Sequence, residues 1–256
     1  MKRTISIFLA IITLTSSLFL TSCSLSVDKT LIDETVLNIE ASEIQKAIQK
    51  CQTMNDATLK RGKDEILSVV VDKLNNYLNT SKWMLTDYRL VDEKTIEELK
   101  EYKELLSLLP LSKTNTNSLD FINKALESEK FIDYNDFYAE TKDDKTMENI
   151  QDYINNANSS SSYSLAITYY KKAQALAEKS YHRFNGKTEK GMAEATLYYN
   201  LLSTNLTNAI NGRDPSATEE SELASAGEKY QSALMDIANS VQELKDIVNE
   251  FPTKIY

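Results

Sequence analysis

The stretch LASAGEKYQSALMDIANSVQELKDIVNEF, residues 223–251, predicts the fold more clearly than any other part of the chain. Its apolar side chains recur every three or four residues, the period of one face of an α-helix. They are Leu223, Ala226, Tyr230, Leu234, Ile237, Val241, Leu244, Val248 and Phe251. Pro215 and Ser216, with Glu219 three residues after the serine, indicate the start of this helix, and Pro252 indicates its end.

At about 1.5 Å per residue this helix is roughly 50 Å long, and its narrow apolar stripe is typical of a bundle or a coiled coil. We expect the stripe to be buried against the two helices before it, which the sequence places near residues 165–184 and 192–210. The alternative is an open seam that awaits a partner. Charged residues on the other faces should lie mostly in water, namely Glu228, Lys229, Asp236, Glu243, Lys245 and Glu250.

The rest of the chain fits the same class. Only five Gly and three Pro occur in 256 residues, fewer than a sheet protein with many tight turns needs. We therefore predict an all-α fold, an elongated antiparallel helical bundle of about six to eight helices with the long C-terminal helix. Further helices are expected near 31–54, 64–78, 96–109, 119–126 and 147–154, with a break at 60–63 and a loop at 113–117.

One helical domain is expected over residues 30–256. The segment 155–162, Asn-Asn-Ala-Asn followed by four serines, is the most linker-like part of the sequence. It is either a long loop or a boundary that subdivides the domain.

The segment 133–138, Asp-Tyr-Asn-Asp-Phe-Tyr, is aromatic and acidic without a clear period. It fails as an EF-hand calcium loop because the sixth position, which needs Gly, is Tyr138. Aromatic residues are enriched at the centres of protein interfaces. We therefore name Tyr134, Phe137 and Tyr138, together with Trp83, as a candidate interaction patch, although packing in the core is the commoner role for Trp83.

The N-terminus has the order of a secretory signal. Lys2 and Arg3 precede a largely apolar run from residue 5 to residue 20, which is too short and too interrupted by Ser and Thr to span a membrane. The run closes on Leu20-Thr21-Ser22-Cys23. These four residues resemble the lipobox of bacterial lipoprotein precursors.

The resemblance implies a signal peptide over residues 1–22, and diacylglyceryl and acyl chains such as palmitate on Cys23. It further implies a lipidated tether over 23–29, and a body exposed outside the cytoplasm on either the cell membrane or the outer membrane. Several acyl chains on one residue exceed the roughly two-signal threshold for stable anchoring.

Charge excludes some partners. The net charge of −9 becomes −11 if residues 1–22 are removed, because the leader holds two of the 29 basic residues and none of the 38 acidic ones. An acidic chain does not favour nucleic acid, so we expect no nucleic-acid partner. Cys51, left without an intrachain partner, continues an apolar series and is expected to be a buried thiol.

Motifs for catalysis are missing from the sequence. His182 is the single histidine, and there is no Gly-rich phosphate loop, no Gly-x-Ser-x-Gly, no Cys-x-x-Cys and no His-Glu-x-x-His. We therefore expect no enzyme activity, no cofactor and no metal site. The favoured function is a non-catalytic interaction protein, either an adhesin, a host-factor binder or an accessory of an envelope complex. The alternatives are a solute-binding or transport-accessory lipoprotein with a pocket between helices, and an immunity or exclusion lipoprotein.

Overall fold

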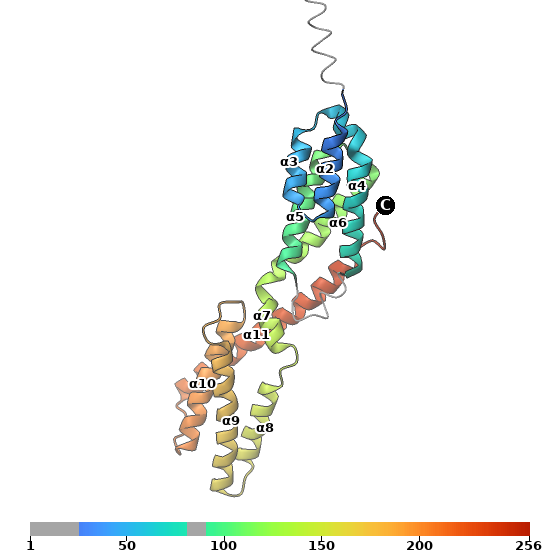
Figure 1. Ribbon diagram of the computed structural model, residues 1–256. Coiled ribbons are helices and arrows are strands. Elements are labelled where there is room, and N and C mark those ends of the chain that lie inside the picture. The colour runs from blue at the N-terminus through green and yellow to red at the C-terminus, as the bar shows by residue number, and fades with distance from the viewer. Residues whose placement is uncertain (1–25, 81–90) are drawn as a thin grey trace, which may run out of the picture. The chain divides into compact units, whose positions relative to one another are not determined.

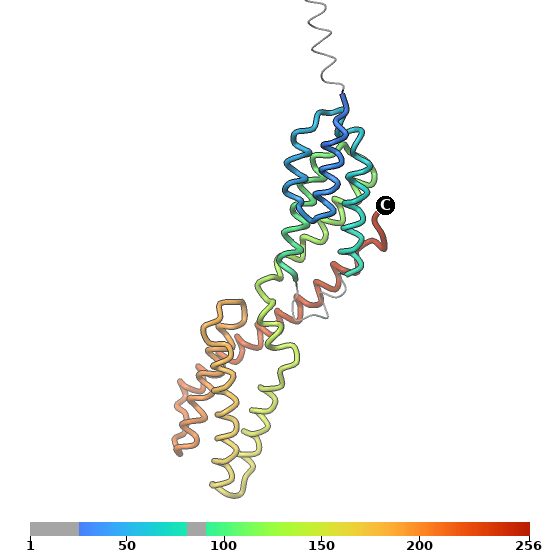
Figure 2. Tube along the Cα trace, in the orientation of Figure 1, coloured from blue at the N-terminus to red at the C-terminus, as the bar shows by residue number. Residues whose placement is uncertain are grey.

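The computed structural model describes residues 26–80 and 91–256, and these residues form helices joined by turns, without a strand (Figures 1 and 2). The predicted all-α helical bundle is confirmed. The described residues divide into two compact units. The first contains 26–80, 93–127 and 250–256, and the second contains 91–92 and 128–249.

The first unit is a closed ring of five helices. They are α2 (Lys29–Glu40), α3 (Ile44–Thr53), α4 (Asp56–Thr80), α5 (Glu93–Leu108) and α6 (Lys113–Leu126). Around the ring, α2 packs against α3 and α4, α3 packs against α5, and α6 closes the ring by contacting both α5 and α4. Isoleucines and leucines that are almost fully buried fill its centre, including Ile39, Ile48, Ile66, Leu74, Ile96 and Leu105.

Two predicted boundaries in this unit are wrong. The expected single helix over 31–54 is two helices, because the backbone turns at Ser42, whose φ is 60°. The expected break at 60–63 lies inside α4. There Gly62 is buried, and a Cβ atom on it would lie 2.7 Å from Cγ1 of Ile32, so this glycine allows α2 and α4 to approach closely.

The expected loop at 113–117 is the first turn of α6. The Ser112 side chain accepts a hydrogen bond from the Asn115 N–H (3.2 Å) and caps the helix. The Asn115 amide is fully buried and donates to the carbonyl oxygens of Leu106 (3.1 Å) and Leu109 (3.4 Å) at the end of α5. The polar residues that predict a loop therefore cap the start of α6 and bond it to the end of α5.

The first residues of this unit are fixed to the turn between α3 and α4. The N–H of Asp28 donates to Oγ1 of Thr58 (2.9 Å), and the Asn55 side chain donates to the carbonyl oxygen of Ser26 (3.1 Å). The carboxylate of Asp28 also caps α2. From Ser26 onward, the described chain is therefore bonded to the first unit.

The last residues of the described chain also belong to the first unit. The Asn75 side chain, on α4, accepts a hydrogen bond from the N–H of Ile255 (2.9 Å) and donates one to its carbonyl oxygen (3.1 Å). Ile255 is buried, and the ring of Phe251 meets that of Phe121 edge-on with centroids 5.0 Å apart.

The second unit contains a 3₁₀ helix and five α-helices. They are η2 (Glu127–Tyr134), α7 (Asn135–Thr141), α8 (Thr146–Asn158), α9 (Tyr163–Phe184), α10 (Met192–Ile210) and α11 (Ala217–Asn249). Helices α8 to α11 pack each against the next, and α11 also contacts α7. Residues 155–162 comprise the end of α8 and the turn into α9, so they lie inside this unit.

The predicted ends of these helices are confirmed. Gly186 and Gly212 follow α9 and α10 with φ of 83° and 72°, a conformation that favours glycine. Before α11 the Glu219 N–H donates to Oγ of Ser216 (3.3 Å), while the Ser216 N–H donates to the Glu219 carboxylate (2.8 Å). This reciprocal pair fixes the start of the helix.

The predicted stripe of α11 is partly confirmed. Tyr230, Ile237 and Leu244 are buried, and the six charged residues expected in water are exposed. Leu223, Leu234, Val241, Val248 and Phe251 are only half-buried, and Ile247 is buried in place of Val248.

An aromatic cluster centred on α11 forms the core of the second unit. Phe137, Phe184, Tyr199 and Tyr230, from four helices, are almost fully buried. The rings of Phe184 and Tyr199 are parallel with centroids 6.0 Å apart, and Tyr230 lies 5.6 Å from Tyr199.

Candidate functional site

The second unit has an open hollow between η2, the start of α10 and the middle of α11. Its cavity volume is about 420 Å³, and we call it the Tyr134 hollow. It is lined by Tyr134, Lys190, Gly191, Glu194, Lys229, Ser232, Ala233 and Asp236. The ammonium group of Lys190 lies 5.0 Å from the centroid of the Tyr134 ring, a distance suited to a cation–π interaction.

Two contacts with segments distant in sequence fix the backbone next to Tyr134. The Glu189 carboxylate accepts hydrogen bonds from the N–H groups of Asp136 (2.8 Å) and Phe137 (3.2 Å) and so caps α7. The Asn135 side chain accepts from the N–H of Val91 (3.0 Å) and donates to its carbonyl oxygen (2.8 Å). Tyr134 therefore lies at the end of a rigid turn.

The environment of Glu189 also affects its protonation. Burial raises the pKa of its carboxyl group, and the nearby carboxylates of Asp136 and Asp133 raise it further, while the two N–H bonds act in the opposite direction. This carboxylate holds α7 in place and does not line the Tyr134 hollow.

The structure corrects the predicted patch. Phe137 is 0 % exposed, so it belongs to the core and cannot form part of a surface patch. Gly191 explains the depth of this ring: a Cβ atom at Gly191 would lie 2.3 Å from Cε1 of Phe137, and its φ is 87°. Tyr134 and Tyr138 are half-buried, and Trp83 lies outside the described residues.

Charges around the Tyr134 hollow are mixed. Lys190 and Lys229 supply two cations, and Glu194 and Asp236 supply two carboxylates, at the rim of one aromatic ring. Across the described residues no three His, Cys, Asp or Glu side chains come together in a way that could hold a metal ion. An aromatic ring surrounded by donors and acceptors of both charges suits recognition of a polar protein surface.

An ion-pair network lies nearby in the same unit. The Arg183 guanidinium contacts the carboxylates of Asp144 and Glu140, and Lys187 bonds Glu140 (2.8 Å). Burial raises the pKa of Asp144, but hydrogen bonds from Thr146 and Arg183 outweigh it and hold the pKa below its ordinary value. The network joins α7, α9 and the turn before α8.

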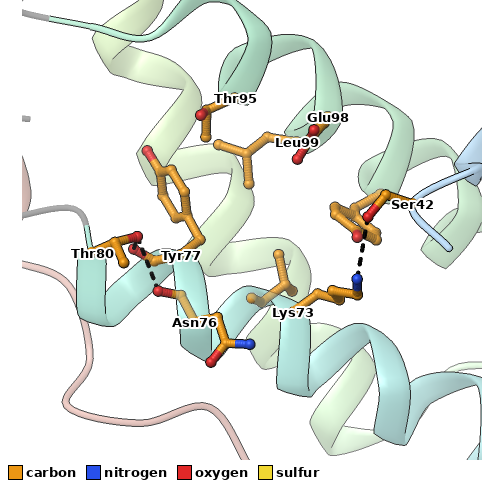
Figure 3. Close-up of a pocket in the computed structure, with 10 residues that line it drawn as sticks. Ser42, Lys73, Asn76, Tyr77, Thr80, Thr95, Glu98 and Leu99 are labelled. Carbon is orange, nitrogen blue, oxygen red and sulfur yellow. Dashed lines mark hydrogen bonds between the residues drawn. The ribbon is translucent and has the colours of Figure 1, made fainter. Parts of the chain in front are cut away.

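The first unit has a groove between α4 and α5, shown in Figure 3, with a volume of about 270 Å³. Buried Leu74 and Leu99 lie among its lining residues, and Lys73 and Glu98 bring opposite charges to it. Lys73 donates to Oγ of Ser42 (3.2 Å) and to the carbonyl oxygen of Glu40 (3.0 Å), so its position is fixed (Figure 3).

Tyr102, in the same groove, is 6 % exposed, and burial raises its pKa to about 12, with the charges of Glu98 and Glu101 adding to the shift. Its phenol is therefore neutral at physiological pH. The groove is slightly smaller than the roughly 300 to 1,000 Å³ typical of small-molecule sites.

The remaining sites predicted from the sequence concern the two cysteines. Cys51 is buried as expected, and burial raises the pKa of its thiol to about 11. Cys23 lies outside the described residues. No helix in the described part of the chain combines the length and apolarity needed to cross a membrane.

Sequence reasoning missed the residues that build the Tyr134 hollow. Asn135, Glu189 and Gly191 have no local pattern that indicates their roles, because each acts on a segment distant in the chain. Comparisons of the chain with protein-family models, curated proteins and solved structures found no match.

Proposed function

We propose that this chain is a non-catalytic interaction protein, held outside the cytoplasm on the cell membrane or the outer membrane by lipid on Cys23. The lipobox-like sequence 20–23 supports the anchor. The proposed binding site for a protein partner is the Tyr134 hollow.

The observation that carries the interaction proposal is the fixed position of Tyr134. Its ring packs against Lys190. The next two residues of the chain are fixed by hydrogen bonds, Asn135 to Val91 and Asp136 to Glu189. Binding of a partner over this ring costs little conformational entropy, because the ring is already ordered. Rigid aromatic residues often dominate the binding energy of an interface. The four charges at the rim favour a partner surface that carries both signs.

Site-specific photo-cross-linking in cells tests this proposal. We expect a photoreactive amino acid at Lys229 to form an adduct of defined mass, and Lys190→Glu to reduce the yield at least about fivefold. The matched control is the same probe at Lys245, which is exposed on the same helix but outside the hollow. Equal adducts from both positions, or none from Lys229, would contradict the proposed site.

A further inference from the structure

The end of the first unit nearest its N-terminus carries exposed apolar side chains. Leu111, in the turn between α5 and α6, is 84 % exposed, the largest value among the exposed large apolar residues of the described chain. Val27, just before α2, is 45 % exposed.

The order of the helices places these two residues at the same end. Residues 26–28 are bonded to the turn between α3 and α4. The groove between α4 and α5 is lined by the first half of α5, the second half of α4 and Ser42. Ser42 comes shortly after the last residue of α2, so the first half of α5 lies at the end of the unit opposite to the start of α2. Helix α5 therefore finishes, and α6 starts, at the end where α2 begins (Figure 2).

From this arrangement we infer that the end of the first unit around Val27 and Leu111 lies directly on the lipid surface, with both side chains among the headgroups. The inference rests on the proposed anchoring through Cys23. It adds a second contact with the membrane, made by the folded protein itself.

The short tether requires this closeness. Three Cα–Cα steps separate Cys23 from Ser26, and fully extended chain spans at most about 3.6 Å per residue, so the reach is roughly 10 Å. Ser26 itself is held by Asn55. The headgroup layer of one leaflet is about 5 to 7 Å thick, so Ser26 can lie at most about 3 to 5 Å above it, and this end of the unit stays beside an attached membrane.

The local charge fits a neutral lipid surface. In the helix turns at this end, Asp28 and Asp56 are acidic, and Lys29, Lys50 and Lys113 are basic. The two signs nearly balance, and Lys50 is paired with Glu34, so attraction to anionic lipid is not the cause of the contact. Removal of Leu111 and Val27 from water is the driving force.

The test attaches the lipid chemically. The mature chain, residues 23–256, is coupled through Cys23 to a maleimide phospholipid in phosphatidylcholine vesicles, at neutral pH, where buried Cys51 does not react. In a Trp83→Phe background, Leu111→Trp is compared with Leu37→Trp. Leu37 is 61 % exposed on α2, ten residues beyond Val27 and therefore about 15 Å further along the unit.

Lipids brominated near the headgroup should quench Trp at position 111 at least about twofold more than Trp at position 37, with a blue-shifted emission at position 111 only. Equal quenching would overturn the inference, as would quenching that requires anionic lipid. Hydrogen exchange of the unsubstituted chain provides a second readout, with slower exchange expected at residues 109–113 on vesicles.

The chemical link separates this test from the proposed function. Acylation in cells is not needed for the quenching experiment, so equal quenching refutes the lipid contact and leaves the anchor intact. Failure of Cys23→Ala to release the protein from cell membranes refutes the anchor, whatever the quenching shows.

Discussion

Gly191 fixes the position of the Phe137 ring through its backbone and through its lack of a side chain. Its φ of 87° disfavours any other residue, and a Cβ atom would overlap the ring. We expect Gly191→Ala to lower the free energy of unfolding by about 2 to 4 kcal/mol, the sum of backbone strain and overpacking. Urea denaturation followed by circular dichroism measures this loss.

Gly186→Ala is the matched control. Gly186 has nearly the same φ, 83°, but nothing lies within 4 Å of a Cβ atom there, so we expect a loss of only about 1 kcal/mol from the backbone. Similar losses for the two variants would show that the packing of Phe137 on Gly191 contributes little.

Asp144 predicts a dependence of stability on pH. Its carboxyl pKa is lower in the folded chain than its ordinary value of 3.8. A lowered pKa means that the stabilisation is complete above about pH 5 and is lost as the pH falls through the folded value. We therefore expect Asp144→Asn to destabilise the protein at pH 7 and to lose part of the acid sensitivity of the natural chain.

Thermal melts between pH 3 and pH 7 check this prediction, with Asp143→Asn as the control because that side chain is 87 % exposed. Glu189, whose pKa is raised, acts in the opposite direction, so only the difference between the variant and the natural chain reports on Asp144. An unchanged acid profile in Asp144→Asn would contradict the role of the ion pair with Arg183.

Helix α11 supplies the central buried side chains of the second unit. Ile237 and Leu244 are 6 % and 1 % exposed. Truncating such a residue costs about 2 to 5 kcal/mol, against a typical total stability of roughly 5 to 15 kcal/mol. The double variant Ile237→Ala and Leu244→Ala should therefore come close to unfolding this unit.

Thermal melts and sedimentation of the chain without residues 1–23 distinguish this outcome from the alternative of an open seam. Met235→Ala is the control on the same helix, since Met235 is 64 % exposed and should change little. An unchanged melting temperature with loss of an oligomer would make α11 a binding surface and refute the buried stripe.

Sequence patterns predicted the elements whose ends carry local signals. Helices α9, α10 and α11 end or begin at Gly186, Gly212 and Ser216, whose capping chemistry is visible in the sequence. The sequence does not predict the turn at Ser42, because the three- and four-residue spacing of apolar side chains continues on both sides of it. The segment around Gly62 predicts a helix break, although Gly62 is a contact point between two helices.

The candidate site was less predictable for a physical reason. Tyr134 is an aromatic residue in a polar segment, which predicts an exposed contact, and in the structure it lines a hollow. Phe137 looks the same in sequence, yet it is buried because Gly191, more than fifty residues later, leaves room for its ring. Contacts between segments distant in the chain decide exposure, and local composition does not record them.

The proposed lipid anchor on Cys23 makes a direct prediction. Replacing Cys23 with Ala should move the protein out of the membrane fraction or leave an unprocessed precursor, because acylation and processing both require that thiol. Fractionation with immunoblotting measures this, and Cys51→Ala is the control for loss of a thiol. A mature-sized Cys23→Ala protein that remains with the membranes would contradict the lipobox interpretation.

The bond between Asn75 and Ile255 has a consequence for the order of synthesis. The first unit takes residues 26–80 and 93–127 from early in the chain and 250–256 from after the second unit. Once a ribosome has made residues 128–249, all the helices of the second unit are present and can pack together. Asn75 and Phe121 still lack their contacts with Ile255 and Phe251, which are made last. The unit that is begun first is therefore completed last, and a chain that stops at Asn249 would contain every helix of the described residues yet leave its first unit unfinished.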